Sequence, residues 1–170
     1  MQKTQVILPE IKLIGISIRT NNNDEISPET GKISSCVKRY FHQSLYNRIP
    51  HRTKPGITLC VYTNYESDHT GDYTYFIGEE VTSFDGCPAE LEQLVIPPQT
   101  YVKFTNGPGP MPEVIREPWF KIWQMSDKTL GGKRNYWADF ELYDERASDH
   151  QNTVVDIFIG IERHFANKFS

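Results

Sequence analysis

The chain has 170 residues and 38% hydrophobic residues, which predicts one domain, or two small halves that share a core. Its formal net charge of −4 argues against a nucleic-acid-binding protein, because such proteins usually present a basic surface. No apolar run reaches membrane-spanning length, and the N-terminal residues lack the pattern of an export signal.

The first half of the chain predicts a strand followed by a helix. β-branched residues alternate over about 12–19, which is typical of a strand. A polar loop follows. Apolar residues at helical spacing then predict a helix over 33–48, with Ser34 or Ser35 as its N-cap and Pro50 as its stop.

A β-hairpin is predicted next. Its strands cover 57–65 and 73–81, and an acidic turn that contains Gly71 joins them. The moderately polar segment 83–94 is interpreted as a connector and as the boundary between two halves of the chain.

The same order of elements recurs after the connector. A strand is predicted at about 99–105 and a helix over 113–125. Pro118 inside that helix predicts a kink, or a helix that starts near Glu117, since proline removes a backbone hydrogen bond and clashes with the preceding turn. Two further strands are predicted, over 136–144 and 154–163.

Each half therefore has the order strand, helix, strand, strand. Phe76-Ile77-Gly78 ends the first half as Phe158-Ile159-Gly160 ends the second. An internal repeat of this size predicts two similar units, about 7–82 and about 94–163, that join through their sheets around a pseudo-two-fold axis. The seam between two such units is a natural position for a ligand pocket.

Glu141 has an unusual position in the strand predicted over 136–144. Asp139, Glu141 and Tyr143 share one face of this strand, and Phe140 and Leu142 share the other. If Phe140 and Leu142 face a core, Glu141 is solvated. If the Glu141 face lines a cleft, a carboxylate stands among aromatic rings and would attract a flat, apolar cation.

Five segments carry a resemblance to a known family, and together they span almost the whole chain: YESD at 65–68, YTYFIGEEV at 73–81, IPPQTY at 96–101, DFELYD at 139–144 and DIFIGI at 156–161. The chain resembles the gyrase-inhibitor-like effector-binding domains that accompany bacterial multidrug-responsive regulators. The integron-associated effector-binding proteins are the branch that it resembles most.

The resemblance implies an α+β fold for residues 1–170 as a single effector-binding domain. Its two βαββ repeats would form an antiparallel sheet with pseudo-two-fold symmetry, two main helices and a central cleft. The cleft of this family binds amphipathic, often cationic, small molecules. A glutamate at the position of Glu141 lines it, which favours the cleft interpretation of the strand.

Aromatic residues are the other candidates for this site. Trp119 and Trp123 share one helix face, so they either pack on the sheet or offer a cation–π surface, and Trp123 is preferred because it lies further from Pro118. Tyr101 and Phe104 point to opposite faces of their strand, and Tyr101 is preferred for its hydroxyl group.

The hairpin contributes two further candidates. Tyr75 shares a face with Tyr73 and lies nearer the strand centre, and Tyr62 lies on the paired strand. Ordinary sheet packing remains an alternative for each of these tyrosines.

The remaining motifs indicate neither a metal nor a catalytic centre. The five histidines and the three cysteines lack ligand spacing, and no nucleophile–histidine motif is visible, so no cofactor is expected. The acidic turn containing His69 is interpreted as solvated. An odd number of cysteines without a signal peptide favours a reducing cytoplasm.

Three functions remain open. The leading hypothesis is a stand-alone module that binds a cationic aromatic compound, for drug sensing or transcription regulation, without its own DNA-binding domain, direct nucleic-acid contact or membrane contact. The second is a hydrolase of small xenobiotics that uses Glu141 with Tyr101 or Tyr75. The third is a protein-interaction module of the gyrase-inhibitor type, with a protein partner or a homodimer.

Overall fold

The structure is a computed structural model that describes residues 1–162. Its strands are β1 Gln2–Leu8, β2 Ile11–Asn21, β3 Thr58–Thr63, β4 Asp72–Glu80, β5 Glu92–Ile96, β6 Gln99–Gly109, β7 Ala138–Tyr143 and β8 Thr153–Ile161. Its helices are α1 Asn22–Glu25, α2 Ile33–His42, α3 Glu113–Gln124 and α4 Asp127–Leu130, with the 3₁₀ helices η1 Leu45–Arg48 and η2 Glu145–Ala147.

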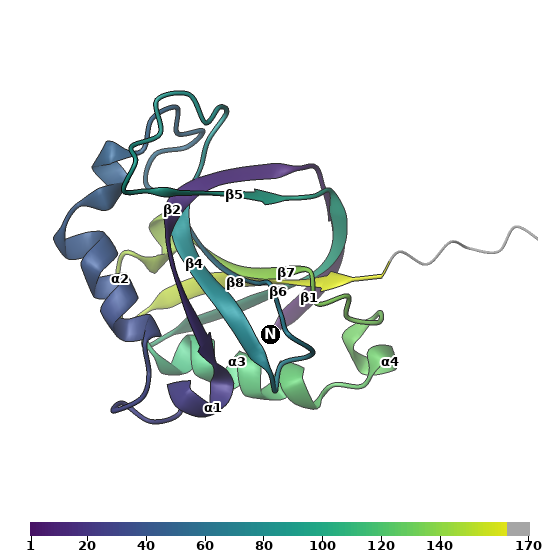
Figure 1. The fold of residues 1–170 in the computed structure, drawn as a ribbon. Helices are drawn as coiled ribbons and strands as arrows, with labels where there is room; N and C mark the ends of the chain where they lie inside the picture. Colours follow the sequence, from purple (N-terminus) through teal and green to yellow (C-terminus); the bar gives the residue numbers. More distant parts are fainter. Residues whose placement is uncertain (163–170) are drawn as a thin grey trace, which may run out of the picture.

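All eight strands form one antiparallel sheet in the order β1-β6-β8-β7-β3-β4-β2-β5 (Figure 1). This order is symmetric about the β3–β7 pair, because β4 corresponds to β8, β2 to β6, and β5 to β1. The α+β fold with two βαββ repeats is thereby confirmed, as β2-α2-β3-β4 and β6-α3-β7-β8.

Sequence reasoning missed the two edge strands. β1 pairs with β6 of the second repeat, and β5 pairs with β2 of the first. Each edge strand therefore precedes one repeat in the sequence but pairs with the other repeat in the sheet. This exchange links the two halves of the chain. β1 was missed because it is largely exposed and carries little hydrophobic signal.

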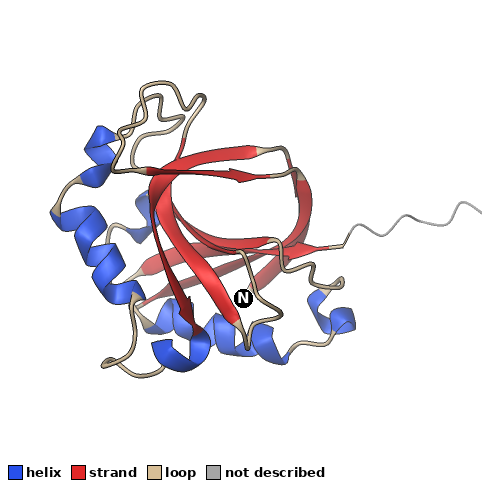
Figure 2. Cartoon of the chain, in the orientation of Figure 1, coloured by secondary structure: helices blue, strands red, loops and turns tan. Residues whose placement is uncertain are grey.

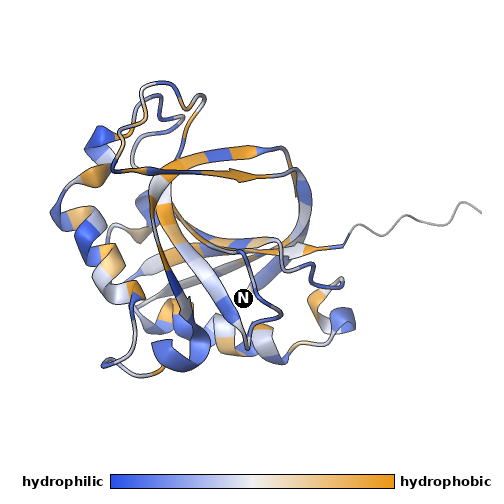
Figure 3. Ribbon diagram, in the orientation of Figure 1, coloured by the Kyte–Doolittle hydropathy of each residue, from blue (hydrophilic) through white to orange (hydrophobic). Residues whose placement is uncertain are grey.

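The two main helices cover one face of the curved sheet, and α2 contacts β2 and β4 whereas α3 contacts β6 and β8 (Figure 2). Two apolar clusters lie beneath these helices, and a third fills the opposite, concave face. Hydrophobic residues gather along the strands, while α1 and the connecting loops are hydrophilic (Figure 3). Glu141 lies between the two helix-covered clusters.

The helix of the first repeat is shorter than predicted. α2 ends at His42, and Ser44, in the left-handed region with φ 49°, separates it from η1. Ser34 and Ser35 do not cap it. The Glu25 carboxylate does so instead, since its Oε1 accepts hydrogen bonds from the backbone N–H of Lys32 (2.7 Å) and of Ile33 (3.3 Å).

The helix of the second repeat begins at Glu113 and continues through Pro118 to Gln124. The prediction that the helix starts near Glu117 is therefore wrong. Pro118 is buried, so its ring contributes apolar surface that offsets the hydrogen bond it cannot donate.

The glycine of the repeated Phe-Ile-Gly motif has a structural reason in both halves. A Cβ at Gly78 would lie 2.2 Å from the carbonyl oxygen of Ile14 on the neighbouring strand. A Cβ at Gly160 would lie 2.7 Å from Oδ1 of Asn135. Only glycine permits such close approach.

The last strand, β8, ends at Ile161. The predicted end of this strand and of the second repeat at residue 163 lies outside the described residues. Within residues 1–162, no helix has the length and apolar character needed to span a bilayer.

Candidate functional site

Glu141 lies in β7, in the middle of the sheet, beneath α3. It pairs with Cys60 on β3 and with Ile157 on β8, so its side chain shares the helix-covered face with theirs. Only 4% of its surface is exposed. The alternative of a solvated carboxylate is therefore wrong.

Three neutral donors hold this carboxylate. Oε1 accepts hydrogen bonds from the Tyr62 hydroxyl (2.7 Å) and from Trp119 Nε1 (2.9 Å), and Oε2 accepts one from the Tyr143 hydroxyl (2.7 Å). Among the residues that the structure describes, no lysine, arginine or histidine forms an ion pair with Glu141. The negative charge has hydrogen-bond partners but no counter-charge.

Burial raises the pKa of Glu141, and the three hydrogen bonds offset this shift only in part. Burial, followed by the nearby Glu141, raises the pKa of both Tyr62 and Tyr143 well above the usual range. These two hydroxyl groups therefore remain protonated donors, and the site can hold one negative charge that a ligand cation would neutralise.

Aromatic rings enclose the carboxylate. The Tyr62 ring centroid lies 5.0 Å from that of Trp119, 5.4 Å from Tyr73 and 5.5 Å from Tyr75. Tyr62 and Tyr143 contact both helix-side clusters. At the position expected for the central cleft, these side chains cover Glu141.

The structure corrects two preferences among the predicted site residues. Tyr101 lies on the concave face, packed edge-on against Phe140 and Phe158, so it does not share a face with Glu141. Phe104, the alternative on the same strand, faces the helices instead. The strand register determines which of the two residues shares a face with Glu141. Phe104 pairs with Ile157, which in turn pairs with Glu141, so these three side chains point to the same face of the sheet.

Trp119, rather than the preferred Trp123, bonds to Glu141. Trp123 is half-buried further along α3 and stacks against His69, with ring centroids 6.0 Å apart. The turn containing His69 is solvated at Glu66, Ser67 and Thr70, as predicted, but the His69 ring contacts α3. The predicted catalytic pairs of Glu141 with Tyr101 or Tyr75 are not formed. Glu141 accepts hydrogen bonds from Tyr62 and Tyr143 instead.

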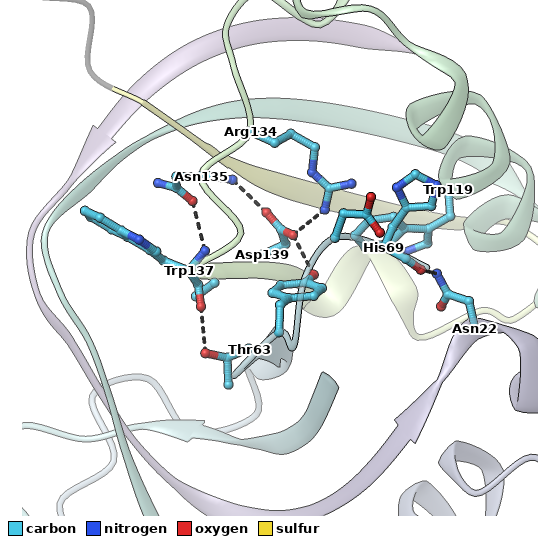
Figure 4. A network of polar contacts seen from close by, with 12 residues as sticks. Asn22, Thr63, His69, Trp119, Arg134, Asn135, Trp137 and Asp139 are labelled. Atoms are coloured by element: carbon cyan, nitrogen blue, oxygen red, sulfur yellow. Dashed lines mark hydrogen bonds and ion pairs between the residues drawn. The ribbon is translucent and has the colours of Figure 1, made fainter. Parts of the chain in front are cut away.

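A second buried carboxylate, Asp139, lies on the same face of β7 (Figure 4). Its Oδ2 accepts hydrogen bonds from Arg134 Nη2 and from the Tyr65 hydroxyl, both at 2.6 Å, and its Oδ1 accepts one from the Gly160 N–H at 2.8 Å. Unlike Glu141, Asp139 has a paired cation. Alternation placed Asp139 beside Glu141, but nothing local in the sequence indicated Arg134 as its partner.

Comparison with known proteins agrees with this architecture. Residues 6–161 match the family described as integron-associated effector binding protein. The chain belongs to that family.

Three relatives of this effector-binding protein illustrate the match. YobU of Bacillus subtilis (strain 168), named as a proposed transcriptional regulator, is 29% identical over 152 residues, which cover 89% of this chain and 92% of YobU. An integron cassette protein from the mobile metagenome of Vibrio cholerae shares 27% identity and a TM-score of 0.73, covering 94% of this chain and 95% of its own.

The third relative shows the shared fold alone. It is SAV2435, solved bound to tetraphenylphosphonium, with 17% identity and a TM-score of 0.74 over 95% of this chain and 94% of its own. Within the described part of this effector-binding protein, no group of three or more His, Cys, Asp or Glu side chains is arranged to hold a metal ion.

Glu141→Gln is expected to leave this effector-binding protein folded. The glutamine Oε1 can accept from Tyr62 and Trp119, and its amide N–H can donate to the Tyr143 hydroxyl oxygen. Because the pKa of Glu141 is raised, its stabilising contribution is present below the unfolded-state pKa of about 4.3 and is lost as the pH rises through the folded-state pKa.

Urea unfolding across this pH range measures the difference. The free energy of unfolding of the wild type should fall relative to that of Glu141→Gln as the pH rises. A constant difference between the two proteins would show that Glu141 titrates as an ordinary carboxyl group.

Proposed function

We propose that the chain binds an amphipathic aromatic cation at Glu141, between its two repeats. The observation that carries this proposal is a buried carboxylate that three neutral donors hold and that no cation of the described residues pairs with. A carboxylate that has lost its water and lacks a counter-charge gains most from a cation brought by a ligand.

The rings around Glu141 suit the apolar part of such a ligand. Trp119, Tyr62 and Tyr75 supply aromatic rings close to the carboxylate, and such rings attract cations through their quadrupoles and bury hydrophobic surface. The same rings cover the carboxylate in this structure, so the ligand must displace at least one of them to reach it. Trp119 belongs to α3, and a small outward shift of this helix would open the site.

Support for this ligand class also comes from the relatives. SAV2435, which shares the fold, was solved with tetraphenylphosphonium, a cation that carries four aromatic rings. YobU is named as a proposed transcriptional regulator. We propose that ligand binding here serves drug sensing or transcription regulation. We further propose that the response to the ligand passes through a partner protein.

Titration with tetraphenylphosphonium tests the proposal, with tryptophan fluorescence as the readout because Trp119 bonds directly to Glu141. The affinity of Glu141→Gln should be at least about tenfold lower than that of the wild type, which corresponds to about 1.4 kcal/mol. Triphenylphosphine oxide, a neutral aromatic compound, serves as the control ligand and should show no dependence on Glu141.

Equal affinity of both proteins for the cation would argue against the proposal and would favour the protein-interaction alternative, which does not depend on Glu141. The hydrolase alternative receives less support from the geometry, because three donors already occupy both Glu141 oxygens. Recovery of a chemically unchanged ligand after incubation separates binding from turnover.

A further inference from the structure

A cavity lies beyond Trp123, between the end of α3, α4 and the segment that leads to β7. Its volume is about 170 Å³. The apolar part of its wall comes from Ile122, Trp123, Met125 and Leu130. A cavity of about 150 Å³ can admit benzene, so this cavity has the size of a single aromatic ring.

Arg134 supplies the polar part of the wall. Its side chain is only 8% exposed, and its Nη2 donates to Asp139 at 2.6 Å. Nε and Nη1 are buried and have no hydrogen-bond partner among residues 1–162. A buried N–H group without an acceptor raises the free energy of the folded protein. A guanidinium has five N–H groups, so an acceptor that reached either of these two nitrogens would be stabilised by a hydrogen bond.

Tyr136 packs against the face of the guanidinium and so leaves the hydrogen-bonding capacity of its N–H groups unused. The Tyr136 ring lies over Arg134, with the guanidinium carbon 4.3 Å from the ring centroid. The backbone of Tyr136 is in the left-handed region, with φ 53°, which is strained for an aromatic residue. Strain of this kind is found where the surrounding structure serves a functional site.

His69 contributes a further buried polar atom near the cavity. Its Nδ1 is buried and finds no hydrogen-bond partner in the described part of the chain, and its ring stacks against Trp123. The Asn22 side-chain amide fixes the turn by donating to the His69 carbonyl at 2.8 Å (Figure 4). Two more charged residues line the cavity: Lys133 and the exposed Asp127, which oppose each other in sign.

We propose that this cavity binds an aromatic carboxylate. A carboxylate oxygen would accept from Nε or Nη1 of Arg134, which lie on different edges of the guanidinium, and the ring would lie against Trp123 and the apolar wall. Charge-assisted hydrogen bonds of this type are about twice as strong as neutral ones. Since Lys133 already pairs with Glu162 at 3.6 Å and Asp127 is negative, affinity would come from the hydrogen bond to Arg134 and from apolar burial rather than from a general positive field.

This site goes beyond the cation site at Glu141. Trp119 lies between the two sites. It donates a hydrogen bond to Glu141, and its ring centroid lies 6.5 Å from that of Trp123. The predicted ligand also has the opposite charge. Failure of either proposal therefore leaves the other intact, and Glu141→Gln is the matched control for the carboxylate site.

The test is a titration of the wild type with sodium benzoate, followed through the ¹⁵N–¹H signal of Arg134 Nε. Sodium chloride at equal ionic strength is the reference, and the other arginine Nε signals are internal controls. The signal can be assigned by through-bond transfer from the backbone, so no variant is needed. We expect a saturable shift of the Arg134 signal with benzoate at millimolar concentrations and quenching of tryptophan fluorescence with the same midpoint.

Three variants complete the test. Arg134→Lys keeps a positive charge beside Asp139 but lacks Nε and Nη1, and should bind benzoate at least about tenfold more weakly. His69→Phe keeps a ring beside Trp123 and should weaken binding about threefold or more. Glu141→Gln should bind benzoate as the wild type does. A shift that does not saturate, or one that chloride reproduces, would overturn the proposal even if a variant fails to fold.

Discussion

Asp139→Ala is expected to lower the free energy of unfolding by about 3–5 kcal/mol. Asp139 is fully buried, and its removal leaves the Arg134 guanidinium, itself 8% exposed, without a counter-charge. The Tyr65 hydroxyl and the Gly160 N–H lose their acceptor at the same time. Urea unfolding monitored by circular dichroism measures the change.

A double-mutant comparison separates the unpaired charge from the lost hydrogen bonds. Asp139→Asn keeps an acceptor for Gly160 but still leaves Arg134 unpaired, so it should also be strongly destabilised. Adding Arg134→Met should restore part of the stability, because the stranded charge is removed. Strictly additive losses in the double variant would show that the Arg134–Asp139 pair is not coupled.

The affinity for tetraphenylphosphonium is expected to fall as the pH drops below the pKa of Glu141, by at most about tenfold for each pH unit, until it levels off near the affinity of Glu141→Gln. A cation gains from Glu141 only when the carboxyl group is ionised. Burial raises the pKa of Glu141, so protonation begins at a higher pH than for an exposed glutamate and the loss of affinity should begin there too. Fluorescence titrations in a series of buffers from neutral to acidic pH measure the profile.

Glu141→Gln is the control for this profile, since its side chain cannot titrate. Its weaker affinity should remain constant over the same range as long as the protein stays folded. A profile for the wild type that is equally flat, or that falls only at the pH of an ordinary carboxyl group, would contradict the proposed role of the buried carboxylate.

Periodicity predicted the repeats well because each repeat carries its own hydrophobic pattern. The strands that became β3, β4, β7 and β8 and the helix that became α3 were predicted within a few residues, whereas the helix that became α2 was predicted from the correct start but ends six residues earlier, at His42. The exposed β1 and the partly exposed β5 were missed, since their positions depend on pairing with the other repeat. Local sequence cannot show such pairing.

The sequence predicted the central carboxylate of the site, Glu141, better than the aromatic residues that surround it. Strand alternation placed Glu141 with Asp139 and Tyr143, and the family resemblance favoured a cleft. The choice of Tyr101 failed because a strand residue's face follows from register with its neighbours, and here Tyr101 pairs with Gly160 on the face opposite Glu141. The choice of Trp123 over Trp119 failed because the direction of α3 over the sheet decides which ring reaches β7.

The sequence by itself determined the repeat, the α+β class and the presence of a carboxylate among aromatic residues, because these depend on local periodicity and on residue type. Only the tertiary structure decided three properties of residues 1–162: Glu141 is buried without a cation beside it, Asp139 pairs with Arg134, and Arg134 and His69 have polar atoms without hydrogen-bond partners near Trp123. These properties arise when segments far apart in the chain exclude water together, and burial of that kind cannot be read from neighbours along the sequence.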